Sequence, residues 1–213
     1  MTEAAWFKPA RITERILQNG YITEVQAAEL QRRGVTHLLN LDLPYASTRI
    51  VMPAGLTITE LLVHDMAPLS ADDARRVVAV LQRALDLDGG RVYVHCNAGL
   101  SRSPTAVWLY LVASGWEPEQ ASAVIAAAAK HLDAPDSILV SELDLDALRT
   151  WAGQPRWEVW LRGTKTHDSL LAVLPTEAAA AAERDALEAK ARAWAARGRE
   201  VHVRYEVLEA RPR

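Results

Sequence analysis

Cysteine is almost absent from this sequence: Cys96 is the only one among 213 residues. A single thiol excludes an intramolecular disulfide framework and is typical of a reducing compartment. No stretch approaches the roughly 18 consecutive apolar residues of a membrane-spanning helix, and the first 15 residues hold no uninterrupted apolar core of a signal peptide. We therefore expect a cytoplasmic protein with no membrane span.

An excess of either charge is also missing. The 24 Lys and Arg residues against 27 Asp and Glu residues give a formal net charge of -3. This balance argues against bulk binding to nucleic acid. With 50% hydrophobic and 24% charged residues, the composition is that of an ordinary globular protein, long enough for one domain with an appendage or for two small domains.

The first 151 residues alternate between strand-like and helix-like patterns. Short apolar runs predict strands over 35–44, 56–65 and 91–95, and apolar periodicity predicts helices over 23–34, 70–90, 103–115, 117–131 and 137–151. Ser70 and Asp73 have the spacing of a capping box at a helix start. The order predicts an α/β fold in which helices cover both faces of a central, mostly parallel sheet.

Gly153 and Pro155 interrupt the helical pattern and indicate a linker. We expect a catalytic domain over 1–152 and a small α+β module over 153–213. The patterns of this module predict strands over 156–163, 169–176 and 200–210 and a helix over 177–198, in the order ββαβ. Its tryptophans are expected in its core: Trp157, Trp160 and Trp194. The module either stabilises the catalytic domain or forms a partner-binding or dimerising surface.

The cysteine lies directly after the predicted strand 91–95, in a loop that leads into a helix N-terminus. Free backbone N–H groups and the helix dipole favour an anion there. Gly99 allows close approach of the backbone, and Arg102 offers a planar fork for two phosphate oxygens. The same positive surroundings favour a Cys96 thiolate, a nucleophile aimed at phosphorus, and the Ser103 hydroxyl could donate to it. The predicted phosphate-binding loop consists of Asn97, Ala98, Gly99, Leu100, Ser101 and Arg102.

The segment "HCNAGLSRS" matches the signature H-C-x5-R-[S/T] of the cysteine-dependent protein tyrosine phosphatases, and the chain most resembles their dual-specificity branch over about residues 10 to 151. The resemblance implies a phosphocysteine intermediate on Cys96 and neither metal nor cofactor. It also implies a general acid about thirty residues before the cysteine, and Asp65 is 31 residues before it. His95 would order the loop and tune the thiolate.

Other acidic and histidine residues have simpler explanations. Asp72 and Asp73 are weaker candidates for the acid because helix capping accounts for them, and His64 is expected to be a loop residue beside Asp65. The remaining histidines lack companions at ligand spacing, so no metal site is predicted.

The expected substrate is a phosphorylated protein or a small phosphomonoester, with phosphotyrosine first and phosphoserine and phosphothreonine next. Uncharged positions in the loop disfavour a phosphoinositide without excluding one, and a phosphoglucan also stays open. Two other classes remain: a phosphate-reading adaptor with little turnover, and a sulfurtransferase or arsenate reductase with a similar loop. The placed Asp65 argues against both, and the single cysteine argues further against the reductase.

Overall fold

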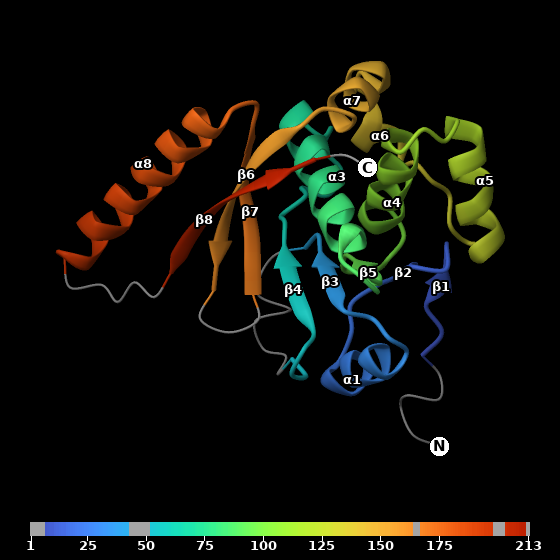
Figure 1. The fold of residues 1–213 in the computed structure, drawn as a ribbon. Coiled ribbons are helices and arrows are strands. Elements are labelled where there is room, and N and C mark those ends of the chain that lie inside the picture. Colours follow the sequence, from blue (N-terminus) through green and yellow to red (C-terminus); the bar gives the residue numbers. More distant parts are fainter. Residues whose placement is uncertain (1–6, 43–51, 164–166, 198–202, 212–213) are drawn as a thin grey trace.

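The computed structural model of the chain describes residues 7–42, 52–163, 167–197 and 203–211 (Figure 1). The helices are α1 (Glu24–Arg32), α3 (Ala71–Asp86), α4 (Arg102–Ala113), α5 (Pro118–Ala128), α6 (Ser137–Val140), α7 (Leu145–Ala152) and α8 (Glu177–Ala195). The strands are β1 (Ala10–Arg11), β2 (Ile16–Asn19), β3 (His37–Asn40), β4 (Thr57–Glu60), β5 (Val92–His95), β6 (Arg156–Arg162), β7 (His167–Leu174) and β8 (Arg204–Ala210).

The eight strands within the described residues form one sheet in the order β1-β2-β5-β3-β4-β7-β6-β8. Neighbouring strands from β2 to β7 run parallel, whereas β1 is antiparallel at one edge and β6 and β8 are antiparallel at the other. The predicted mostly parallel sheet with flanking helices is thus confirmed. Because parallel strands end at the same edge, the segments that follow β2, β3, β4 and β5 are brought together there.

Helices cover both faces of the parallel part. Neighbouring side chains in a strand point to opposite faces, and in β3 Leu38 joins the buried cluster around α1 while Leu39 joins the larger cluster with α3 and α4. Tyr93 and Val94 divide in the same way in β5. Figure 1 shows α3 and α4 side by side, away from α1. The strand that leads to Cys96 is therefore buried on both faces.

Helix starts follow the local signals. Ser70 caps α3 by accepting a hydrogen bond from the Asp73 backbone N–H, as its spacing predicted, and Pro118 occupies the first turn of α5. The helix predicted over 137–151 is wrong in one respect, because it is split into α6 and α7. Asp144 explains the break: its side chain caps α7 by accepting from the Ala147 N–H. No strand was predicted for β1 or β2.

The C-terminal region has the predicted ββαβ order, and its strands extend the same sheet through the parallel pairing of β7 with β4. The start of the last predicted strand, residues 200–202, lies outside the described residues. Trp160 is buried as expected, but Trp194 on α8 is 53% exposed, so its placement in the core was wrong. Most of α8 is solvent-exposed, and Ala180 is its one buried residue. The division at residue 152 stays a prediction.

A buried carboxylate joins this region to α3. Glu158 is fully buried and accepts from Arg83 of α3, from Arg156 at 3.2 Å, and from the Trp160 indole N–H at 2.9 Å. Arg83 also donates to the Glu209 carbonyl at 3.2 Å. Within the part of the chain that the structure describes, no helix is long and apolar enough to cross a membrane.

Candidate active site

The cysteine lies at the base of a loop between β5 and α4, as the sequence predicted. Cys96 is 2% exposed, and the Gly99 backbone N–H points to its Sγ at 3.3 Å. Because α4 begins at Arg102, the loop ends on a helix N-terminus whose free N–H groups favour an anion. The position therefore combines a buried sulfur with a cradle for an oxyanion.

Glycine is required at two contacts that hold this loop. Gly99 has a φ of +77°, and a Cβ there would lie 2.5 Å from the carbonyl carbon of Asn19. A Cβ on Gly20 would lie 2.6 Å from the Asn97 carbonyl oxygen. That oxygen accepts from the Tyr21 N–H at 2.8 Å. The turn after β2 thus supports the loop by backbone contacts that leave no room for side chains.

Ser103 is fully buried beneath the loop, with its Oγ 3.4 Å from the Cys96 Sγ. The same hydroxyl lies 3.2 Å from the Asn19 carbonyl oxygen. The Gln18 side-chain amide donates to the Ser103 Oγ at 2.7 Å and to the Gly99 carbonyl at 2.8 Å. The sequence reasoning missed Gln18, because it belongs to β2 and only the parallel pairing of β2 with β5 brings it here.

The Arg102 guanidinium contacts two carboxylates. It is 7% exposed and pairs with Asp42 at 2.9 Å and with Asp65 at 3.4 Å. Asp65, the predicted acid, is 56% exposed and so stands at the mouth of the site. Asp42 was missed because it fell within the predicted strand 35–44, and only the pairing of β3 with β5 brings it here. The structure therefore brings Cys96, Arg102, Ser103 and Asp65 together.

The rival acids are occupied at the start of α3. Asp73 accepts from the Ser70 hydroxyl at 2.7 Å and pairs with Arg76, while Asp72 pairs with Arg75 at 3.2 Å. Both carboxylates thus have side-chain partners there, but the cap of α3 is made by the Ser70 hydroxyl and not by either aspartate. His64, beside the predicted acid, is exposed.

His95 is 1% exposed and stacks at a tilt on Tyr93, with ring centroids 5.7 Å apart. Within the described residues, neither of its ring nitrogens has a hydrogen-bond partner. Burial lowers the pKa of His95 to about 4, and the nearby Cys96 backbone and the charge of Asp42 offset only part of that effect. The ring is therefore neutral at neutral pH.

A second loop is tied to the predicted phosphate-binding loop through Asp136, which the sequence reasoning also missed. Its carboxylate accepts from the Ser101 hydroxyl at 2.5 Å and from the Ile138 N–H at 3.0 Å. Its own N–H donates to the Thr105 hydroxyl at 2.8 Å. The loop around Asp136 therefore fixes the position of the Ser101 side chain.

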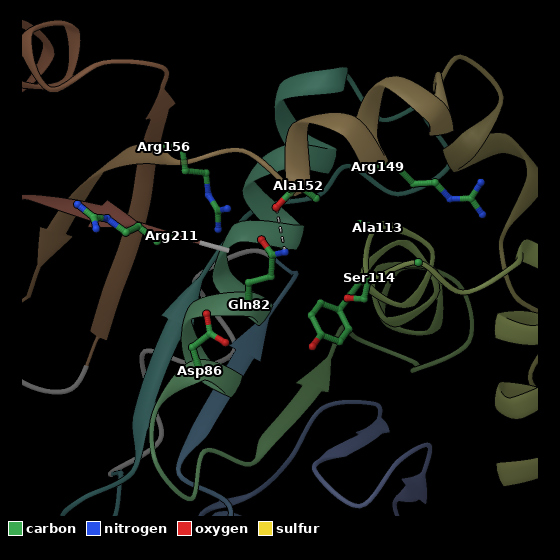
Figure 2. Close-up of a pocket in the computed structure, with 11 residues that line it drawn as sticks. Gln82, Asp86, Ala113, Ser114, Arg149, Ala152, Arg156 and Arg211 are labelled. Carbon is green, nitrogen blue, oxygen red and sulfur yellow. Dashed lines mark hydrogen bonds between the residues drawn. The ribbon is translucent and has the colours of Figure 1, made fainter. Parts of the chain in front are cut away.

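A cavity of about 440 Å³ lies elsewhere, at the C-terminal ends of α4 and α7 (Figure 2). Its lining includes Gln82, Asp86, Tyr110, Ser114 and Arg156. None of its lining residues belongs to the loop 96–103. Since α4 is 12 residues long, its two ends are about 18 Å apart, and the cavity is separate from the cysteine.

In the comparison with protein families, residues 4–143 match the model described as "PTP-SAK: Swiss Army Knife protein, DSP-PTPase phosphatase domain". That range contains the cysteine loop, Asp42 and Asp65, and it covers well over half of the chain.

Curated relatives cover a smaller part. The chain is 39% identical over 89 residues to dual specificity protein phosphatase 26 of Bos taurus, which covers 39% of this chain and 41% of the relative. It is 28% identical over 111 residues to dual specificity protein phosphatase PHS1 of Arabidopsis thaliana, over 49% of this chain and 11% of the relative. The chain thus spans less than half the length of these relatives.

Among solved structures, PTPMT1 in complex with PI(5)P is similar, with a TM-score of 0.50 and 28% identity. The match covers 67% of this chain and 92% of that one. The similarity therefore includes nearly all of the PTPMT1 fold and leaves about a third of this chain unmatched.

Proposed function

This chain belongs to the PTP-SAK family of dual-specificity phosphatase domains, and we propose that it hydrolyses phosphomonoesters through a phosphocysteine intermediate. One observation carries the proposal: the buried Cys96 Sγ lies at the base of a loop that ends on the N-terminus of α4, and Arg102, the first residue of that helix, lies 3.4 Å from Asp65. An adaptor needs the cradle alone, whereas this arrangement also includes a nucleophile and an acid.

In the first step, the phosphoryl group is held by the loop N–H groups and Arg102, and the Cys96 thiolate attacks phosphorus. The S–P bond forms while the bond to the leaving oxygen breaks, and Asp65 gives its proton to that oxygen. The 3.4 Å contact of Asp65 with Arg102 supports this role, because it keeps the carboxyl group beside the phosphate-binding guanidinium.

In the second step, a water molecule attacks the phosphocysteine. The Asp65 carboxylate takes a proton from the water, the S–P bond breaks, and its electron pair returns to sulfur. The Ser103 hydroxyl, 3.4 Å from Sγ, stabilises the negative charge that develops there. Inorganic phosphate leaves, and the thiolate is restored.

We propose phosphotyrosine as the preferred substrate, with phosphoserine and phosphothreonine as slower ones. The side chains that the loop exposes, those of Asn97, Ala98 and Leu100, are uncharged and offer no further phosphate sites. The partial exposure of Asp65 fits a shallow site that accepts more than one phosphorylated side chain.

A phosphoinositide is the second candidate substrate. The observation that favours it is the similarity to PTPMT1, whose solved complex contains PI(5)P. The absence of lysine from the loop 97–101 argues against inositol rings with several phosphates. Initial rates with phosphotyrosine peptides and with PI(5)P in the same buffer separate the two candidates.

The proposal is tested by hydrolysis of p-nitrophenyl phosphate in the presence of a metal chelator. We expect turnover by the wild type and a loss of at least about 1000-fold in Cys96→Ser, because the nucleophile is gone. Asp65→Asn should lose about 100-fold or more of the wild-type rate with an alkyl phosphate, whose alcohol is a poor leaving group. Asp72→Asn is the matched control and should behave as the wild type, since Asp72 pairs with Arg75. Full activity of Cys96→Ser would exclude the mechanism, and tight phosphopeptide binding without turnover would favour an adaptor.

A further inference from the structure

Gln18 lies directly beneath the phosphate-binding loop although it comes from a different strand. It is 1% exposed, and its backbone pairs with Val94, two residues before the cysteine. Its side-chain nitrogen donates to the Gly99 carbonyl at 2.8 Å and to the Ser103 hydroxyl at 2.7 Å. The same nitrogen also lies 3.4 Å from the Asn19 carbonyl oxygen, so its two shortest hydrogen bonds are those to Gly99 and Ser103.

The orientation of this amide follows from its partners. The Gly99 carbonyl can only accept, so the group facing it must be the amide nitrogen and not the amide oxygen. The Gln18 Oε1 is then buried without a partner among the described residues, which lowers the stability of the fold. An apolar side chain of similar size would avoid this loss. A glutamine at this position therefore points to a role in the loop rather than in packing.

The single hydrogen of the Ser103 hydroxyl defines this role. A serine hydroxyl has one hydrogen, and an amide nitrogen cannot accept one. The contact with Gln18 therefore occupies an acceptor position of the Ser103 Oγ and leaves its hydrogen for the Asn19 carbonyl at 3.2 Å or the Cys96 Sγ at 3.4 Å. A hydroxyl that accepts a hydrogen bond is also a stronger donor.

We propose that Gln18 is a positioning residue that acts through Ser103. It donates to the Ser103 Oγ and thereby leaves the serine hydrogen two acceptors, the Asn19 carbonyl and the Cys96 Sγ. The hydroxyl donates to the sulfur when the sulfur is negatively charged. The inference rests on the proposed function. In the phosphocysteine the sulfur is neutral, and the hydrogen lies toward Asn19. As water attacks and the S–P electron pair moves to sulfur, the hydroxyl turns to Sγ and donates a hydrogen bond to it, while the water proton goes to Asp65.

The consequence is specific to one step. Removing the Gln18 donors should slow the breakdown of the phosphocysteine about 3- to 10-fold, the size of one ordinary hydrogen bond, and leave its formation within about 2-fold of wild type. Rapid-quench measurement of labelled phosphocysteine gives the two rates separately. A general loosening of the loop would instead slow both steps, because both need the phosphoryl group in place.

The experiment compares the wild type, Gln18→Met, Ser103→Ala and the double variant. We expect Gln18→Met to slow breakdown when Ser103 is present and to have no further effect in the Ser103→Ala chain. Gln82→Met is the matched control and should leave both rates unchanged. The Gln82 amide oxygen is also buried without a partner among the described residues, but its amide nitrogen donates to the Ala152 carbonyl at 3.5 Å, away from the loop. Should Gln18→Met fail to fold, Gln18→Leu takes its place in the set.

Equal losses from Gln18→Met with and without Ser103, or an unchanged rate of breakdown, would overturn the inference while leaving the phosphatase itself intact. Failure of the proposed function has a different signature, namely a wild-type chain that neither labels Cys96 nor releases phosphate.

Discussion

The parallel half of the sheet and its antiparallel C-terminal half both bury polar side chains, but they use them differently. Around β2 and β5, the buried Gln18 and Ser103 contact a loop and a sulfur, and they leave Gln18 Oε1 unsatisfied within the described residues. In β6, the buried Glu158 is surrounded by donors from Arg83, Arg156 and Trp160. The buried polar groups around β2 and β5 shape a site and lower the stability of the fold. Those around Glu158 attach the C-terminal strands to α3.

The C-terminal network should therefore affect stability alone. We expect Glu158→Ala to lower the free energy of unfolding by about 3 to 5 kcal/mol, because it leaves the Arg156 charge buried without its partner. Burial already lowers the pKa of Arg156, and Glu158 opposes that effect. Urea unfolding measures the loss, and kcat per folded molecule should stay at the wild-type value. A fall in kcat of the folded fraction would show that the two halves are coupled.

Changes in the loop between β5 and α4 should instead lower activity, and two glycines allow a matched test. Gly99→Ala should lower kcat/KM about 100-fold, since its new Cβ would displace the loop from the Asn19 backbone by an ångström or so. Gly115→Ala has the same left-handed strain, at a φ of +98°, with nothing within 4 Å of its Cβ. It should cost about 1 to 2 kcal/mol of stability and leave kcat/KM unchanged. Equal kcat/KM values for the two variants would contradict the prediction that the loop needs a fixed backbone position.

Buried His95 should make the parallel half sensitive to acid. Its pKa is about 4 in the folded chain against 6.5 when unfolded, so the unfolded chain binds the extra proton between these values and stability falls as pH drops through that window. The effect amounts to about 2 kcal/mol between pH 7 and pH 5. Unfolding midpoints at the two pH values should differ less in His95→Gln than in the wild type. An identical difference in both chains would contradict the assignment.

The smallest effect is expected at Asp42. Its carboxylate and a bound phosphate share Arg102, so Asp42→Asn should tighten inhibition by inorganic phosphate about 3- to 10-fold by removing one like charge. The amide oxygen can still accept from the guanidinium. Weaker inhibition would mean that Asp42 mainly holds Arg102 in position.

The same contrast explains what the sequence could predict. Cys96, Arg102 and Ser103 were found because one continuous segment carries them, and Asp65 because the family resemblance gives its spacing. Gln18 and Asp42 could not be found in this way, since they reach the loop only through the pairing of β2 and β3 with β5. The roles assigned to the site residues remain predictions.

Outside the site, local signals predicted most elements, and the errors have both local and tertiary causes. The α6–α7 break depends on one capping side chain, Asp144, within an otherwise helical pattern. Trp194 was expected in a core because of its size, yet α8 turns it to solvent. The link of the C-terminal strands to β4 had no signal in the sequence, because the pairing joins residues more than a hundred positions apart.

The central claim, a phosphate carried on the cysteine, is tested most directly by rapid acid quench of the chain with a labelled aryl phosphate, followed by peptide mass spectrometry. We expect one phosphoryl group on Cys96 in the wild type, a longer-lived one in Asp65→Asn, and none in Cys96→Ser. Release of phosphate with no label on Cys96, or label on another side chain, would contradict the account.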